Sequence, residues 1–183
     1  MTKQDFNEFL KRVDQQKKET QAIDWEKKKN EWLAYLNKLY EKFNFYLEEY
    51  IAEGIITINY QNVKITEEYI GSYTAPEMII NLGNEQVILT PVGTNLIGAK
   101  GRVDIAGRLG SAQLVLIDAN TRNVNDPLRK PESENQEPTN ESEEKKALPK
   151  TWEWKFVSAP PTRKFQPVNE ETIYSVIMEV TNG

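Results

Sequence analysis

The stretch "NLIGAKGRVDIAGRLGSAQLVLID", residues 95–118, holds four of the nine glycines of the chain and separates two interpretations of its fold. A phosphate-binding loop needs Gly-x-x-x-x-Gly-Lys-Ser/Thr, or Gly-x-Gly-x-x-Gly between a strand and a helix. Neither spacing occurs here, and apolar and charged residues alternate from Ile97 to Ile105 as they do along a strand. We therefore predict a β-hairpin that turns at residues 106–110 and continues as a strand over 111–118.

The hairpin carries three basic residues, Lys100, Arg102 and Arg108. They are candidates for a small anion-binding patch, although charged residues on an exposed strand also occur simply because they confer solubility. We expect Gly98 and Gly101 to allow a bulge or a sharp bend of the sheet.

The sequence on both sides of the hairpin also has the period of two that strands require. Further strands are predicted at residues 55–60, 63–69, 77–82, 86–91 and 151–158. Tight turns at Gln61-Asn62 and Gly83-Asn84 join the first four in pairs, and Pro76 marks the start of the second pair. With the hairpin, these segments predict a mainly antiparallel, curved sheet of about seven strands.

Helices are predicted at both ends of the chain. Residues 2–53 contain no Gly or Pro, and Gly54 suits the position after a helix. The polar span "QQKKETQA", residues 15–22, leaves a long helix and a helical hairpin as alternatives, and an unbroken helix would be about 78 Å long and would need a partner along its exposed length. Near the other end, Asn169 is the expected N-cap of a helix over 169–181.

These elements predict an α+β protein with a helical segment at 1–53 and a β-rich domain at 54–183. The domain includes the tract 119–150, which contains four prolines and no aromatic residue. Such a composition cannot bury enough apolar surface to become ordered, so we expect a solvated, disordered loop. A binding tail is the alternative interpretation of this tract.

The composition excludes several kinds of chemistry. The chain has no Cys and no His, which removes disulfides, Ser-His-Asp triads, Cys-His pairs and zinc sites of the usual type. The net charge of −5 is divided evenly, so no segment has the basic excess of a nucleic-acid binder. The N-terminal sequence lacks the apolar core of a secretory signal, and no run is long enough to span a membrane, so we expect a cytoplasmic protein.

The remaining candidates for catalysis are weak. The carboxylates of the sheet domain are Glu67, Glu68, Glu77 and Asp104, and two that converged would bind a cation or act as acid and base. Ser111 with Lys100 is a loose candidate for a dyad. An aromatic set would suit base stacking, but we favour a place for it in the core, because no positive groove accompanies it. Its members are Tyr60, Tyr69, Tyr73, Trp152, Trp154 and Phe156.

The most informative pattern is the apolar stripe of the N-terminal helix, which resembles that of a coiled coil. Residues repeat every seven positions from Trp25 onward, and a shorter apolar face lies upstream at Phe6, Phe9, Leu10 and Val13. The apolar residues from Trp25 onward form three rows along the helix, which is more than a single coiled-coil contact requires. We therefore expect one part of the stripe to face the sheet and another to face a second protein. The predicted partner-binding residues are Trp25, Trp32, Leu36 and Phe43.

We therefore expect a non-enzymatic adaptor, inhibitor or immunity-like protein that binds another protein, or a second copy of itself, through this helix. One alternative is a nucleic-acid or anionic-ligand module that uses Lys100, Arg102 and Arg108 with Arg163 and Lys164. The other alternative is a carboxylate-dependent enzyme. No cofactor and no metal are expected.

Overall fold

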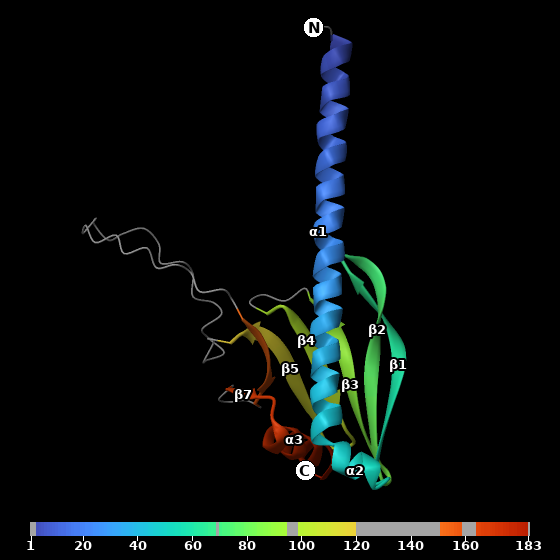
Figure 1. The fold of residues 1–183 in the computed structure, drawn as a ribbon, viewed down its shortest axis with the longest axis vertical. Helices are drawn as coiled ribbons and strands as arrows, with labels where there is room; N and C mark the ends of the chain where they lie inside the picture. The colour runs from blue at the N-terminus through green and yellow to red at the C-terminus, as the bar shows by residue number, and fades with distance from the viewer. Residues whose placement is uncertain (1–2, 69, 95–98, 120–150, 159–163, 183) are drawn as a thin grey trace, which may run out of the picture.

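The chain folds as one antiparallel sheet crossed by a long helix (Figure 1). The computed structural model describes residues 3–68, 70–94, 99–119, 151–158 and 164–182, with the backbone alone at 3–5, 13 and 16–24. The elements are α1 (Lys3–Tyr46), α2 (Glu48–Ala52), β1 (Ile56–Glu67), β2 (Gly71–Leu82), β3 (Glu85–Gly93), β4 (Gly101–Ala106), β5 (Ser111–Asp118), β6 (Trp152–Val157), β7 (Phe165–Pro167) and α3 (Glu170–Asn182).

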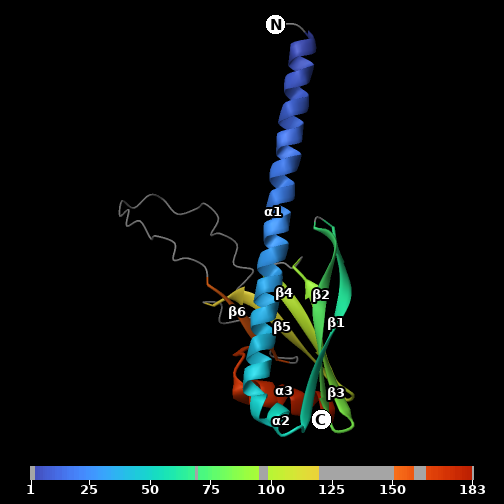
Figure 2. The same cartoon turned by 45° about the vertical axis from the view of Figure 1, so that its right-hand side comes forward.

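The sheet is a seven-stranded meander in the order β1 to β7, and every neighbouring pair is antiparallel. Figures 1 and 2 show α1 running across one face of the curved sheet, with α3 beside its C-terminal end. The predicted α+β class, with an N-terminal helix, seven strands and a C-terminal helix, is confirmed. The long helix, and not the helical hairpin, is the form that α1 takes.

One long strand replaces the two strands that the sequence predicts at 55–60 and 63–69. β1 has twelve residues, and its pairing with β2 runs without a register shift from Ile56, opposite Leu82, to Glu67, opposite Gly71. The hairpin between β1 and β2 therefore turns after Glu67, and the prediction of a turn at Gln61-Asn62 is wrong.

The physical reason is twist. Near its start β1 buries Ile56 and half-buries Ile58, whereas near its end it buries Ile65 and Glu67. Even-numbered residues thus face the core first and odd-numbered residues later, because a two-stranded ribbon coils strongly about its own axis. Residues 59–62, where the faces exchange, are all exposed, and the alternation breaks there as it does at a turn.

Pro76 lies inside β2 and not at the start of a strand. It pairs with Asn62 of β1, while the pairing of β2 with β3 covers only the stretch that begins at Met78. A proline is tolerated there because its strand has a neighbour on one side only. At this point of β2, the Tyr40 hydroxyl of α1 donates a hydrogen bond to the Pro76 carbonyl oxygen at 2.8 Å.

The hairpin of β4 and β5 turns between Ala106 and Ser111, as the glycine-rich stretch predicts. The register shift lies in β3, between Pro91 and Gly93. Gly98, the other glycine expected to permit a bend, lies outside the described residues. Gly101 has a packing role instead, because a Cβ atom built on it would overlap the ring of Trp32.

The core lies between the sheet and the C-terminal half of α1. Trp32 packs against Trp154 of β6 with ring centroids 5.7 Å apart, and the Trp154 indole N–H donates to the Tyr35 carbonyl oxygen at 2.9 Å. α3 closes one end of this core with the apolar side chains predicted for it, Ile173, Val176, Ile177 and Val180. The Asn169 side chain caps α3 by accepting from the Thr172 amide at 2.9 Å, as predicted.

Of the predicted loop 119–150, residues 120–150 lie outside the described residues. Its base is fixed, because the Ala119 amide donates to the Thr151 carbonyl oxygen at 2.7 Å. In the described part of the chain, no helix has the length and the apolar composition needed to cross a membrane.

Candidate functional site

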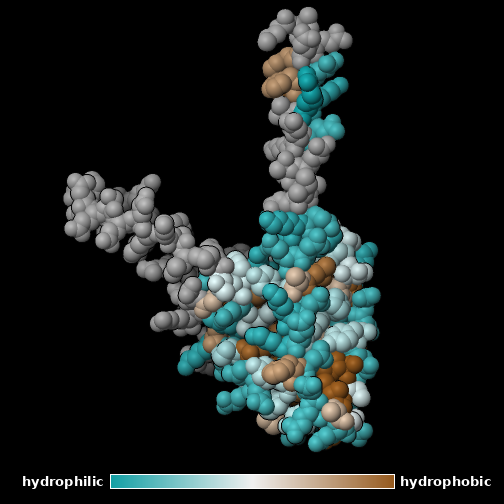
Figure 3. All heavy atoms as spheres, in the orientation of Figure 1, coloured by the Kyte–Doolittle hydropathy of each residue, from teal (hydrophilic) through white to brown (hydrophobic). Residues whose placement is uncertain are grey.

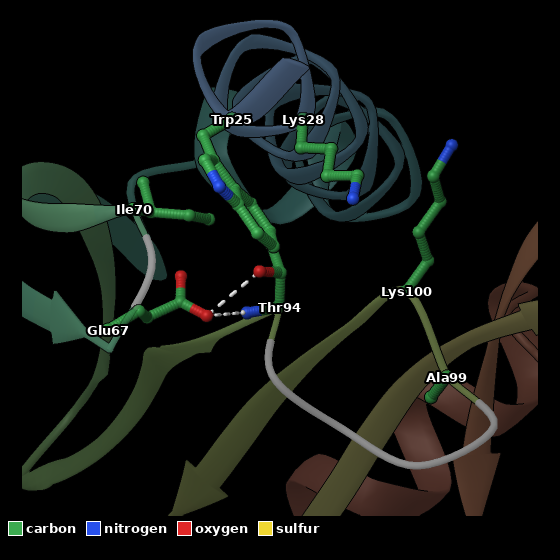
Figure 4. A pocket seen from close by; sticks show the side chains of 7 residues that line it. All are labelled: Trp25, Lys28, Glu67, Ile70, Thr94, Ala99 and Lys100. Atoms are coloured by element: carbon green, nitrogen blue, oxygen red, sulfur yellow. Dashed lines mark hydrogen bonds between the residues drawn. The ribbon is translucent and has the colours of Figure 1, made fainter. Parts of the chain in front are cut away.

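α1 is longer than the sheet it crosses, and two features lie where it leaves the sheet. The first is a cavity of ≈ 290 Å³ beneath the helix (Figure 4). The second is the part of α1 that precedes Trp25 and extends beyond the sheet (Figures 1 and 3). The cavity is lined by Trp25, Lys28, Glu67, Ile70, Thr94, Ala99 and Lys100.

Glu67 forms the floor of the cavity and is 8% exposed. One carboxylate oxygen accepts from the Thr94 amide at 2.9 Å and from the Thr94 hydroxyl at 2.8 Å (Figure 4). The other oxygen accepts from the Tyr73 hydroxyl at 2.6 Å. Three donors therefore replace the water that this carboxylate loses on burial. Burial, together with the Glu67 carboxylate, holds the pKa of Tyr73 well above its ordinary value.

Two lysines lie at the mouth of the cavity, and each has contacts within the protein. The Lys28 ammonium lies 4.2 Å from the centroid of the Trp25 ring. The Lys100 ammonium is 2.7 Å from a Glu31 carboxylate oxygen and also lies over the rings of Tyr35 and Trp152. The cavity thus has an apolar wall, a positive rim and a carboxylate on its floor that already accepts three hydrogen bonds.

The predicted anion-binding residues do not form one cluster of available charge. Lys100 pairs with Glu31 of α1, Arg102 binds both oxygens of Asp104 within its own strand, and Arg108 pairs with Glu85. The hydrogen bonds that Arg102 donates to Asp104 raise the pKa of the Arg102 guanidinium. An anion would have to displace a carboxylate at each position. Of the two further candidates, Lys164 is exposed and Arg163 lies outside the described residues.

The other carboxylates also have structural partners. Glu77 is 6% exposed and accepts from the Gln61 side-chain amide and the Thr90 hydroxyl. Glu68 is exposed and lies in the turn that follows β1. Within the described residues, no three carboxylates come together as a metal site would require.

The loose Ser111–Lys100 dyad does not form. Ser111 is opposite Ala106 at the turn end of the β4–β5 hairpin, while Lys100 precedes Gly101 at the other end. Of the aromatic set, Trp154 and Phe156 lie in the core as predicted, Trp152 is half-buried and Tyr69 lies outside the described residues. Tyr60 is exposed and accepts from the Asn44 side chain at 2.8 Å.

Three of the four predicted partner-binding residues are inside the protein. Trp32, Leu36 and Phe43 are buried between α1 and its own sheet, so a partner cannot reach them in this conformation. Trp25 is half-buried at the rim of the cavity. Their burial has a simple cause, because a periodic stripe shows which side of a helix is apolar but not which length of it the sheet covers.

The exposed apolar surface of α1 lies upstream of all four. Phe6, Phe9 and Leu10 are 60%, 53% and 47% exposed, and the two phenyl rings stack with centroids 6.4 Å apart. With Val13 they occupy positions i, i+3, i+4 and i+7 of one helix face. The spacing of the sequence predicts this apolar face, although the predicted partner-binding residues lie on the longer stripe downstream.

Comparison of the chain with protein-family models, with curated proteins and with solved structures finds no match. The structure itself defines an α+β protein whose long N-terminal helix extends past a single antiparallel sheet.

Proposed function

We propose that this chain is a non-enzymatic binding protein that inserts the first part of α1 into an apolar groove of another protein. The observation that carries the proposal is the exposure of Phe6, Phe9 and Leu10 on a segment that no other described part of the chain covers. Large apolar side chains gathered on one exposed face are characteristic of interaction sites.

The spacing of these side chains favours a groove. Recognition of a helix in a groove uses anchors at i, i+3, i+4 and i+7, which are the positions of Phe6, Phe9, Leu10 and Val13. A groove encloses a helix on several sides and so buries more of these side chains than a flat surface can. Stacking of Phe6 on Phe9 also restricts the two rings before binding, which lowers the entropic cost of association.

Charge favours a protein groove over other partners. Residues 1–24 contain five basic and five acidic residues, so this segment has no positive excess to attract a membrane surface or a nucleic acid. A symmetric pair of these helix faces is also disfavoured. Each exposed side chain offers on the order of 100 Å², so a pair would bury less than the roughly 1,000 Å² of a stable interface.

The test begins in the native host with the full-length chain carrying a photo-crosslinking phenylalanine analogue at position 10. The same analogue at Lys42, an exposed position on the covered half of α1, is the control for chance contacts. A protein cross-linked only from position 10 is then purified, and its dissociation constant is measured by calorimetry. We expect Phe6→Ala and Phe9→Ala each to weaken binding roughly 10- to 100-fold, because each removes a side chain that the partner's groove buries in the proposed complex.

Glu8→Ala is the matched control, because Glu8 is exposed on the opposite side of the same helix segment. It should change the dissociation constant less than about threefold, the scale of surface substitutions outside the contact. All three variants should keep the circular dichroism and the melting temperature of the parent chain, since none touches the core. Equal effects of Phe9→Ala and Glu8→Ala, or cross-links from both positions to the same proteins, would refute the proposal.

A further inference from the structure

β1 forms one edge of the sheet, and it is unusual among edge strands. It has twelve residues, contains no Gly or Pro, and pairs with β2 without a bulge. Figures 1 and 2 show it at the margin of the sheet, and its Tyr60 contacts α1 through the Asn44 side chain and the Tyr40 ring. Among the described residues, no backbone group of 56–67 bonds to anything outside the sheet ladder.

Proteins ordinarily protect such an edge, because its outward N–H and C=O groups can pair with another strand. The opposite edge follows this rule, since β7 has only three residues and ends at Pro167. β1 lacks these devices. Lys64 is its one exposed charge, and its other exposed side chains are Thr57, Asn59, Tyr60, Gln61, Asn62 and Thr66.

We propose that β1 pairs antiparallel with β1 of a second copy of this chain, across a twofold axis at Asn62. Such an axis places even-numbered residues opposite even-numbered residues and odd-numbered residues opposite odd-numbered ones. The N–H and C=O groups that point away from β2 in one copy therefore meet the corresponding groups of the other copy. A ladder over this strand would form about ten backbone hydrogen bonds. The two sheets would then become one continuous sheet.

The side chains of β1 suit this self-pairing. With Asn62 opposite its own counterpart, Lys64 of each copy lies opposite Tyr60 of the other, an ammonium beside an exposed aromatic ring. No exposed charge faces a charge of the same sign, although the whole chain carries −5. An unrelated strand would gain the same backbone hydrogen bonds, but nothing in β1 would specify an aromatic ring opposite Lys64.

The experiment is sedimentation velocity on the full-length chain from low micromolar to hundreds of micromolar. We expect a reversible dimer in the wild type. Asn62→Lys and Asn62→Asp each put like charges opposite at the axis, and each should raise the dimer dissociation constant about tenfold or more. Mixing the two variants should restore dimers, because lysine then faces aspartate. Asn84→Lys adds the same charge at an exposed turn and should leave the dimer unchanged.

Hydrogen exchange identifies the contact. Alternate amides of β1 should exchange more slowly at dimer-forming than at monomeric concentrations. A chain that stays monomeric throughout, a dimer that Asn62→Lys leaves intact, or a dimer without protection of β1 would each overturn the proposal. The result is separable from the proposed groove binding, because Phe9→Ala alters the projecting helix and should leave this dimer unaffected.

Discussion

The close contact between Gly101 and Trp32 makes Gly101→Ala a sharp test of how α1 packs on the sheet. A Cβ atom at residue 101 would overlap the indole ring of Trp32, which is buried and also packs on Trp154. The backbone itself permits alanine, since Gly101 is not among the glycines with positive φ. The cost of the substitution therefore comes from packing alone.

The expected magnitude follows from two opposing effects. Overpacking a core position costs about 1–3 kcal/mol, whereas replacing glycine by alanine in a strand contributes about 0.5–1 kcal/mol of stability. The net loss should be about 1–2 kcal/mol, which corresponds to a melting temperature lower by roughly 2–8 °C for a domain of this size. Urea unfolding followed by circular dichroism measures the change in the free energy of unfolding.

The decisive comparison is a double-mutant cycle with Trp32→Leu, which by itself should cost about 3 kcal/mol through the cavity it leaves. In that background the extra methyl group enters open space, so Gly101→Ala should cost nothing or should stabilise the chain. Additive effects of the two substitutions would show that Gly101 and Trp32 do not touch, and the packing argument would be refuted.

Three further predictions address single contacts. Glu67→Gln should cost about 1–3 kcal/mol in urea unfolding, because an amide NH₂ cannot accept the hydrogen bonds that the carboxylate accepts, whereas Glu68→Gln should be neutral. Asn169→Ala should cost about 1 kcal/mol by removing the cap of α3, with Asn169→Asp close to neutral. Burial first, and the Glu77 carboxylate second, hold the pKa of Tyr40 well above 10.0. Its contribution to stability is therefore complete below pH 10 and is lost as the pH rises further, so Tyr40→Phe should reduce the alkaline slope of the unfolding free energy by about 1.4 kcal/mol per pH unit.

Much of the fold could be predicted because the period of the sequence changes clearly after Gly54. The β4–β5 hairpin, the face of β6 that carries Trp154 and the capped helix α3 all follow from spacing and turn residues. β1 could not be predicted in the same way. Its core-facing parity changes within the strand, and a single sequence does not distinguish a twisted strand that exchanges faces from two strands joined by a turn.

The candidate site could be predicted only in part, for a related reason. The sequence shows which residues of α1 are apolar. How much of α1 the sheet covers, however, depends on the length of the strands. Glu67 illustrates the same limit, because the residues that satisfy it, Tyr73 on β2 and Thr94 just after β3, follow it by 6 and 27 positions. Tertiary partners of this kind leave no periodic signal.

The lengths of the elements explain why the projecting segment exists at all. A twelve-residue strand such as β1 spans about 40 Å, whereas the 44 residues of α1 span about 66 Å. A helix whose C-terminal end is anchored by Leu47 at one end of the sheet must therefore extend beyond the other end by a third or more of its length. The seven-residue apolar repeat begins at Trp25, close to the point at which this cover is lost.

The same lengths affect how the projecting segment can bind. A helix of some twenty residues held at one end only is marginally stable in water, so part of its binding energy must be spent on ordering the segment. Substitutions that raise its helix propensity without touching Phe6, Phe9 or Leu10 should then tighten binding. Asn7→Ala is such a substitution, since Asn7 is exposed and alanine is favoured by roughly 0.7 kcal/mol in a helix. A gain of up to about threefold in affinity would support groove binding by a preformed helix, and a loss would show that Asn7 itself contacts the partner.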